Sequence, residues 1–511
     1  MRTQRSINLQ FPLAGLDERG AYQNQPPYST PAAWNVRPRE PIEGRSRGGS
    51  RPGLVRAFAL RLGTEGSRPI RLSDYIIYEV DNVQKIRFVA IAGGLFYHEN
   101  PEGTLILVEV DGEIGPFTTT RAIHATQRGQ KLYIADSTGT PSGRIYDPVA
   151  GTVSAWVADE GTLPDGCPLI SLYRDRIVLA SGNDWFMSRQ GNPAQWDFAD
   201  DPNDSTRAVS GATSPQAGII GDPITAIIPY TDDYFIFACE ANMWVLRGDP
   251  ALGGQIDNLS RTVGMVDQKA WCHGPRGEIF FLDRGGLYVL PAGATASPEL
   301  LSEQLPTRMQ DIEKATYTVL LGYDDRRKGI LIWIVHNTSV SPIHFWYDLP
   351  NKSFWPMEVP GAFEPMSLCM YHATTATRNA VMFGGYDGYV RKFSDAAVDD
   401  DGTDISSYVF IGPFRLGDSD SEGILEAISG VVAEDGGNVT WSIMIGDSAE
   451  SVVSAAASAT GEWVPGTNYV SRPRVRGVSC IVKLSNGTDA APWGIESIQA
   501  RLRKIGPVRK F

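Results

Sequence analysis

The stretch IRFVAIAGGLFYHE, residues 86–99, decides the fold class. It consists of an apolar run, a Gly-Gly pair and a second run that is rich in aromatic residues. A two-residue glycine turn between two such runs is typical of a β-hairpin, because glycine adopts the positive φ that tight hairpin turns need. The stretch therefore predicts a pair of antiparallel strands.

The same pattern recurs through residues 72–394. Measured between equivalent turn positions, the hairpins are spaced roughly 43 to 59 residues apart, which is typical of four-stranded propeller blades with loop insertions. Seven units can be counted, and one of them could combine with another or with the N-terminal region. We therefore expect an all-β chain with a β-propeller of six or seven blades over 72–394. The other six units lie at 131–147, 176–189, 234–248, 278–292, 329–348 and 380–393.

A break in the pattern follows the expected propeller. Residues 395–404 are acidic and contain no large apolar side chain, which indicates a solvated linker. Beyond the linker the apolar residues alternate with a period of two, as in VTWSIMIG (439–446) and RGVSCIVKLS (476–485). We expect a C-terminal β-sandwich over 405–511, with helix only at 450–460.

Composition narrows the classes of function. The 511 residues include 53 glycines and 34 prolines, which favours many turns and short strands. The five cysteines form no CxxC pair and the six histidines form no HxH or HExxH motif, so we expect no metal site. We also expect no cofactor and no catalytic residues. No apolar run reaches the length of a membrane span, and none near the N-terminus resembles a signal peptide, so we expect synthesis in a cytoplasm.

Charge is distributed unevenly along the chain, whose net charge is −13. Residues 1–71 hold 12 arginines and no lysine against five acidic residues, a net charge of +7. Residues 72–394 hold 24 basic against 38 acidic residues, a net charge of −14. The segment NVRPREPIEGRSRGGSRPGL (35–54) has no helical or strand period. We therefore expect residues 1–71 to form an extended, basic N-terminal arm.

The arm combines arginines with aromatic residues, and both are enriched at protein interfaces. Arginine can bind carboxylates with two hydrogen bonds, and the prolines of the arm restrict it before it docks. We expect the arm to dock on an acidic surface of an adjacent subunit, and the alternative is a solvated tail. The expected docking residues are Tyr28, Trp34, Arg37, Arg39, Arg45, Arg47 and Arg51.

In the order of these segments and in their residue patterns, the chain resembles the tail nozzle proteins of short-tailed bacteriophages. These are also described as hub, DNA-stabilisation or tail tubular proteins. The resemblance covers most of the chain. It is carried by GLDERGAYQNQPPYSTPAAWNVRP (15–38) with GGSRPGL (48–54), by LYRDRIVLASGNDWFMSRQGNPAQWDF (172–198), and by RPRVRGVSCIVKLSN (472–486).

The resemblance implies a structural virion protein of the viral tail, assembled in the host cytoplasm. It implies a homohexameric ring below the portal and adaptor, which contacts distal tail proteins, extends the channel for DNA ejection and helps to retain packaged DNA. The arm would then dock on the adaptor or on a neighbouring subunit. The acidic propeller is consistent with a channel that passes genomic DNA without specific binding, because it would repel phosphate.

Two alternatives from other classes stay open at this point. One is a propeller enzyme of the tail that degrades polysaccharide, and the other is a propeller that binds proteins outside a virion. A cleft of convergent carboxylates would favour the enzyme.

Overall fold

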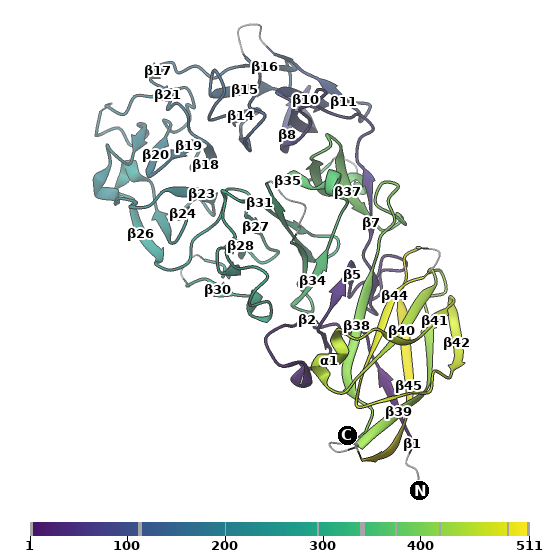
Figure 1. Ribbon diagram of the computed structural model, residues 1–511. Helices are drawn as coiled ribbons and strands as arrows, with labels where there is room; N and C mark the ends of the chain where they lie inside the picture. The colour runs from purple at the N-terminus through teal and green to yellow at the C-terminus, as the bar shows by residue number, and fades with distance from the viewer. Residues whose placement is uncertain are drawn as a thin grey trace.

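The computed structural model describes residues 4–110, 115–199, 201–293, 296–337, 343–373, 376–417, 421–487 and 490–507. Within these ranges the regular structure is β-strand, apart from one helix of five residues and short 3-10 turns. The strands form a propeller-like ring of sheets and a second pair of sheets beside it (Figure 1). The all-β prediction is confirmed.

The ring contains seven sheets that follow one another in chain order. The first comprises β8 (Ile70–Val80), β9 (Val83–Ala92), β10 (Leu95–Glu99) and β11 (Leu105–Leu107). The second comprises β13 (His124–Arg128), β14 (Lys131–Ala135), β15 (Gly143–Asp147) and β16 (Thr152–Ala155), with β12 (Glu109–Val110) parallel to β16. The third comprises β18 (Leu169–Tyr173), β19 (Arg176–Ser181), β20 (Asp184–Met187) and β22 (Val209–Ser210). A short parallel pair joins β17 (Glu160–Gly161), which follows the second sheet in the chain, to β21 (Gln195–Trp196), which lies between β20 and β22.

The remaining four sheets complete the ring. The fourth comprises β23 (Ile224–Pro229), β24 (Tyr234–Cys239), β25 (Met243–Arg247) and β26 (Gln255–Ser260). The fifth comprises β27 (Trp271–His273), β28 (Ile279–Asp283), β29 (Gly286–Leu290) and β30 (Glu299–Leu300). The sixth comprises β31 (Tyr317–Asp324), β32 (Gly329–His336), β33 (His344–Asp348) and β34 (Ser353–Met357). The seventh comprises β35 (Pro365–Tyr371), β36 (Ala380–Gly385) and β37 (Val390–Ser394), with β7 (Gly53–Arg56) as its fourth strand.

The ring is closed by its first and last sheets, since β35 packs against both β31 and β8. Strand β7 comes from the N-terminal region and pairs antiparallel with β37, so that Leu54 lies opposite Phe393. The hairpin expected at 86–99 is present as β9 and β10, with Ala92 opposite Leu95. Gly93 and Gly94 lie between the two strands and have φ of 58° and 79°, values that residues with a Cβ rarely adopt.

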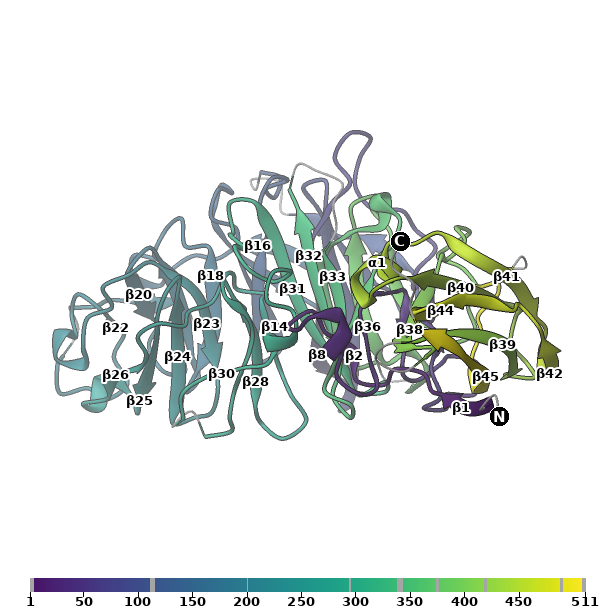
Figure 2. The same ribbon diagram turned by 60° about the horizontal axis from the view of Figure 1, so that its bottom comes forward.

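The second pair of sheets lies beside the sixth and seventh sheets of the ring (Figures 1 and 2). One sheet comprises β1 (Gln4–Leu9), β45 (Ile495–Pro507), β39 (Ser421–Val432) and β42 (Gly466–Ser471), with β43 (Val475–Gly477) paired to β39. The other comprises β4 (Ala33–Trp34), β38 (Tyr408–Arg415), β44 (Ser479–Asn486), β40 (Val439–Gly446) and β41 (Ala457–Trp463). Both sheets share one apolar core, which continues to Trp333 and Trp346 of the ring.

Helix in the described ranges is limited. The helix α1 (Ala449–Val453) begins with a capping box between Ser448 and Ser451, and β41 starts at Ala457. Helix therefore covers only the first part of the stretch 450–460. The 3-10 turns are η1 (Tyr22–Asn24), η2 (Pro215–Ala217), η3 (Pro250–Leu252), η4 (Ser302–Gln304), η5 (Gly361–Phe363) and η6 (Ala376–Arg378).

The N-terminal region differs from the expected extended arm. Its strands enter three sheets: β1 pairs with β45, β4 with β38, and β7 with β37. Shorter pairs form between β2 (Gly15–Leu16) and β3 (Ser29–Thr30), and between β5 (Val36–Arg37) and β6 (Gly49–Ser50). Strand β8 of the ring already begins at Ile70. The region is therefore integrated into the fold, because backbone groups of these short strands are satisfied by partners far away in the sequence.

The acidic stretch 395–404 also differs from a solvated linker. Asp400 is buried, and its carboxylate pairs with Arg51. The aspartates flanking this pair bind arginines as well, Asp395 to Arg327 and Asp401 to Arg391. The acidic residues therefore neutralise arginines of the ring and of the N-terminal region.

Candidate functional site

The seven expected docking residues do not form one surface. Arg37 and Arg51 are buried at 3% and 1% exposure, and the Arg47 side chain is 10% exposed. Tyr28 is 62% exposed, and the Arg45 side chain is 63% exposed. The set therefore divides into an interior group and an exposed group.

Arg51 is held inside the chain by a two-pronged ion pair. Its Nη1 and Nη2 donate to the two carboxylate oxygens of Asp400 at 2.9 and 2.5 Å. Its Nε donates to Oδ1 of Asn35 at 2.9 Å, and Nη2 also donates to the carbonyl oxygen of Glu358 at 2.6 Å. Arg51 therefore ties the N-terminal region to residues 395–404 and to the sixth sheet, and it is not exposed for docking on another subunit.

Arg47 and Arg45 belong to a turn that is organised by Glu40. The Glu40 carboxylate accepts hydrogen bonds from the backbone N–H groups of Ile42, Glu43 and Arg45. Arg47 forms ion pairs with Glu43 at 3.0 Å and with Glu496, and Arg45 pairs with Glu43 at 2.9 Å. The turn is therefore preformed, and its positive charges are already paired within the chain.

The exposed group consists of residues with room for a partner. Tyr28 has a φ of 61° and an exposed ring. Trp34 is partly buried, and its Nε1 donates to Glu358 at 3.1 Å. Arg39 is exposed and donates from Nε to the carbonyl oxygen of Gly44 at 2.8 Å. These three side chains and Arg45 are the part of the expected docking set that lies at the surface.

Arg37 is buried among aromatic rings. The carbon at the centre of its guanidinium lies 4.1 Å from the ring centroid of Trp346 and 4.8 Å from that of Phe393. Its Nη2 contacts Sδ of Met357 at 3.8 Å, whereas Nε and Nη1 have no hydrogen-bond partner in the described structure. Burial, together with the charges of Arg327 and Arg51, lowers the pKa of Arg37 to about 9. At neutral pH, a buried positive charge with two unsatisfied nitrogens therefore remains at this position.

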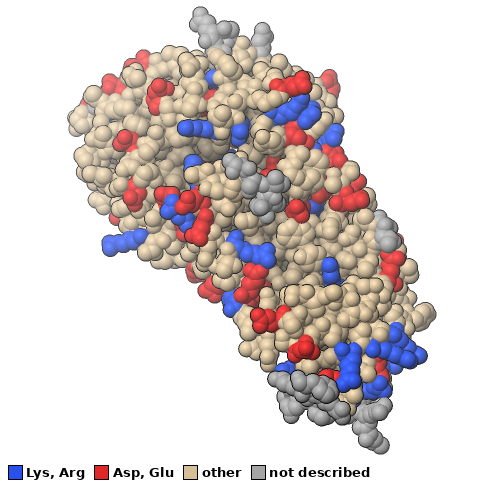
Figure 3. Space-filling model, viewed as in Figure 1, with Lys and Arg blue, Asp and Glu red and all other residues tan. Residues whose placement is uncertain are grey.

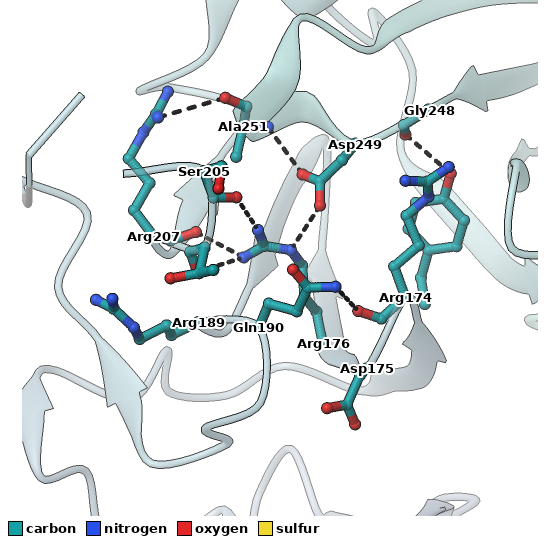
Figure 4. Close-up of polar contacts among 12 residues, drawn as sticks. Arg174, Asp175, Arg176, Arg189, Gln190, Ser205, Arg207, Gly248, Asp249 and Ala251 are labelled. Atoms are coloured by element: carbon teal, nitrogen blue, oxygen red, sulfur yellow. Dashed lines mark hydrogen bonds and ion pairs between the residues drawn. The ribbon is translucent and has the colours of Figure 1, made fainter. Parts of the chain in front are cut away.

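Arg176 in the third sheet is equally buried but has a full set of partners (Figure 4). Its Nε donates to Oδ2 of Asp249 at 3.1 Å. Its Nη1 donates to the carbonyl oxygens of Ser188, Thr206 and Arg207 at 3.0, 3.1 and 2.6 Å, and Nη2 to that of Ser205 at 3.1 Å. Arg176 therefore fixes the loop around residues 205–207 and leaves nothing for a ligand.

A cavity of about 580 Å³ lies at the centre of the ring. It is lined by strands of six sheets, including β13, β23 and β31, and its wall contains Trp271, Tyr323 and Lys269. His124 in the wall is 5% exposed, and its Nδ1 has no hydrogen-bond partner among the described residues. Burial, with the charge of Lys269 nearby, lowers the pKa of His124 to about 3, so this side chain is neutral at physiological pH.

The chemistry of this cavity is limited by its lining. Asp325 is the one carboxylate among the residues that line it. Hydrolysis of a glycosidic bond commonly uses two carboxyl groups that flank the bond. The excess of acidic residues in 72–394 is therefore not concentrated in this cavity, whose size suits a small molecule rather than duplex DNA. Sequence reasoning missed it because its residues come in short groups from strands of six different sheets.

The described part of the chain contains no group of three or more His, Cys, Asp or Glu side chains that could hold a metal ion. None of the helices found there is long and apolar enough to cross a membrane.

The sequence matches no protein-family model and no curated protein. Similar solved structures include the extracellular domains of two-component systems of B. thetaiotaomicron. For BT4673 the identity is 11%, the TM-score is 0.43, and the match covers 67% of this chain and 39% of the other. For BT3049 the identity is 11%, the TM-score is 0.44, and the match covers 82% of this chain and 49% of the other. The chain thus spans less than half the length of these two structures.

A third similar structure is Hsv2 of Kluyveromyces lactis. Its identity is 10%, its TM-score is 0.33, and the match covers 67% of this chain and 93% of Hsv2. TM-scores of this size carry no argument about function. The description of the fold therefore rests on the order and pairing of the strands.

Proposed function

We propose that this chain is a seven-bladed β-propeller joined to a β-sandwich, and that it serves as the tail nozzle, or hub, of a short-tailed bacteriophage. In this proposal six copies of the chain assemble into a hexamer below the portal and adaptor. The hexamer extends the channel through which DNA leaves and helps to retain the packaged genome.

The observation that carries the proposal is the way residues 4–56 join the two parts of the chain. Strands β1 and β4 complete the two C-terminal sheets, and β7 completes the seventh sheet of the ring. Two domains of one chain normally move relative to each other unless their interface is large and apolar. Here one apolar core includes residues of both parts, and the buried pair of Arg51 and Asp400 lies close to the junction. Such a subunit suits a conduit that has to keep its shape.

The distribution of charge supports a role in assembly. On the face shown in Figure 3, acidic and basic side chains are intermixed over the ring, whereas basic side chains gather over the C-terminal sheets. The net charge of −14 over 72–394 disfavours tight binding of duplex DNA, a polyanion, by the propeller, which is consistent with free passage of DNA. The exposed Tyr28 and Arg39 provide an aromatic anchor and a guanidinium group for contacts with another subunit or the adaptor.

The experiment that tests the proposal is mass measurement and cryo-electron microscopy of the purified chain, alone and with portal and adaptor. We expect a closed ring that stacks on the adaptor. We also expect Tyr28→Ala and Arg39→Glu to reduce attachment to the adaptor or the fraction of closed rings. Arg276→Glu is a matched control, because the Arg276 side chain is 88% exposed and lies in the turn between β27 and β28 of the fifth sheet. A chain that stays monomeric with portal and adaptor would contradict the proposal.

A further inference from the structure

A second cavity, of about 250 Å³, lies where the N-terminal region meets the ring. One wall is formed by Arg37, residues 39–44 and Pro52, and the other by Arg326, Arg327, Trp346 and Asp348 of the sixth sheet together with Asp395. Arg37, which is 3% exposed and has two unpartnered nitrogens, belongs to the first wall. The wall of the cavity therefore includes a guanidinium with two N–H groups that are covered by protein and that no atom of the described chain satisfies.

The carboxylates around this cavity are already engaged. Glu40 and Glu43 bind the turn and its arginines, as described above. Asp395 accepts hydrogen bonds from Arg327 at 2.8 and 3.0 Å. Asp348 accepts from the side chain and the backbone of Asn351 at 2.8 and 3.1 Å. None of these carboxylates forms a hydrogen bond with Arg37 in the described structure.

Two further guanidinium groups line the cavity. Arg39 belongs to the same wall as Arg37, and Arg326 belongs to the opposite wall and is exposed. Donors from two walls can be bridged by a ligand whose oxygens point in several directions. A tetrahedral phosphate has this arrangement, whereas a carboxylate has two oxygens in one plane.

We propose that this cavity binds a phosphate group, which accepts hydrogen bonds from the unpartnered nitrogens of Arg37 and from Arg39 and Arg326. The ligand is either free phosphate or the phosphate of a small ester such as a nucleotide, and the volume suits either. Binding satisfies donors that otherwise remain buried without partners, which is the physical reason for the affinity. The inference does not rest on the proposed function, because it concerns one subunit.

The test is isothermal titration calorimetry of the full chain with inorganic phosphate, in a chloride buffer at constant ionic strength. We expect saturable binding to one site per chain. Arg326→Gln removes an exposed donor and should weaken binding about tenfold, which is the effect of losing one charge-assisted hydrogen bond. Arg37→Met should abolish binding. Thermal unfolding of each variant without phosphate shows that it is folded.

Two other variants make the result specific to this cavity. Asp348→Asn removes a carboxylate that repels phosphate and should tighten binding several-fold. Arg276→Gln, far away on the fifth sheet, should leave it unchanged. Equal phosphate affinities of all four variants and the parent would overturn the proposal. The absence of a saturable signal up to about 10 mM phosphate would also overturn it, because a dissociation constant of about 10 mM corresponds to a binding free energy of only about −2.7 kcal/mol.

Two further ligands identify the source of the phosphate group. Deoxyadenosine monophosphate that binds more tightly than inorganic phosphate would support a nucleotide as the ligand. Equal affinities would support free phosphate. Acetate that binds as tightly as phosphate would overturn the preference for a phosphate group and indicate a carboxylate site instead.

Discussion

Arg176 and Arg37 are both buried arginines, but their surroundings differ. Arg176 donates to one carboxylate and four carbonyl oxygens, whereas Arg37 has aromatic rings above its guanidinium and two nitrogens without partners. The first arrangement closes a loop within the third sheet. The second leaves hydrogen-bonding capacity at a cavity between the N-terminal region and the ring. The difference shows that two equally buried arginines can differ in how many of their N–H groups the described chain satisfies.

The largest effect that this comparison predicts is for Arg176. In Arg176→Met a buried Asp249 loses its counter-charge and four carbonyl oxygens lose a donor. We expect the free energy of unfolding to fall by about 3–5 kcal/mol, the usual cost of breaking a buried pair. Urea unfolding followed by tryptophan fluorescence measures this. A loss below about 1 kcal/mol would mean that the pair adds little to stability.

The next largest effect concerns acid, because His124 is a buried base without a partner at Nδ1. Its native pKa of about 3 lies below the usual value of 6.5, so the unfolded chain binds the proton more readily. The stability from this residue is therefore complete above pH 6.5 and is lost as the pH falls toward about 3. The expected slope is about 1.4 kcal/mol per pH unit.

Denaturant unfolding at pH 7 and pH 5 measures this slope in the parent and in His124→Gln. The variant should lose less stability between the two pH values than the parent does. Identical losses would show that His124 titrates normally in the folded protein.

A smaller effect is expected for Arg37. In Arg37→Met a side chain of similar length replaces a buried charge that has no carboxylate partner, so the free energy of unfolding should change by less than about 1 kcal/mol or rise. Thermal unfolding in phosphate-free buffer measures this. A loss as large as that of Arg176→Met would remove the distinction between the two sites.

The smallest effect is expected at the surface. Arg247 and Asp257 form an ion pair at 3.1 Å, with side chains that are 46% and 53% exposed. Asp257→Asn should cost less than about 0.5 kcal/mol, and the difference should vanish in high salt because exposed pairs are screened. A larger loss that is insensitive to salt would indicate a role beyond the pair.

Much of the ring could be predicted from the sequence because its hairpins are local. In the unit 86–99, both strands and their glycine turn lie within 14 residues, and the observed register is the one that the turn requires. The sequence contains seven hairpin units, and the described structure contains seven ring sheets. Because the same short hairpin pattern recurs in each sheet, the sequence predicts the architecture of the ring.

The place of the N-terminal region in the sheets could not be predicted from a local sequence pattern. Strands β4 and β7 have two and four residues, too few for a periodic pattern, and their partners lie more than 300 residues away. Charged residues are usually exposed, so the sequence predicts exposed side chains for the many arginines of this region. Arg37 and Arg51 are exceptions, since their environment is created by the sixth sheet and by residues 393–400. Docking by the exposed Tyr28, Trp34, Arg39 and Arg45 stays a prediction.

The pairing of β1 with β45 has a consequence for synthesis on the ribosome. Gln4 lies opposite Arg503, so the first strand waits for its partner while nearly the whole chain is made. At 5–20 residues per second this delay is on the order of 25–100 s. During that time the unpaired edge of β1 is exposed and prone to aggregation. The C-terminal pair of sheets therefore completes its hydrogen bonding only after β45 has been made, whereas the ring needs no strand beyond β37, which pairs with β7.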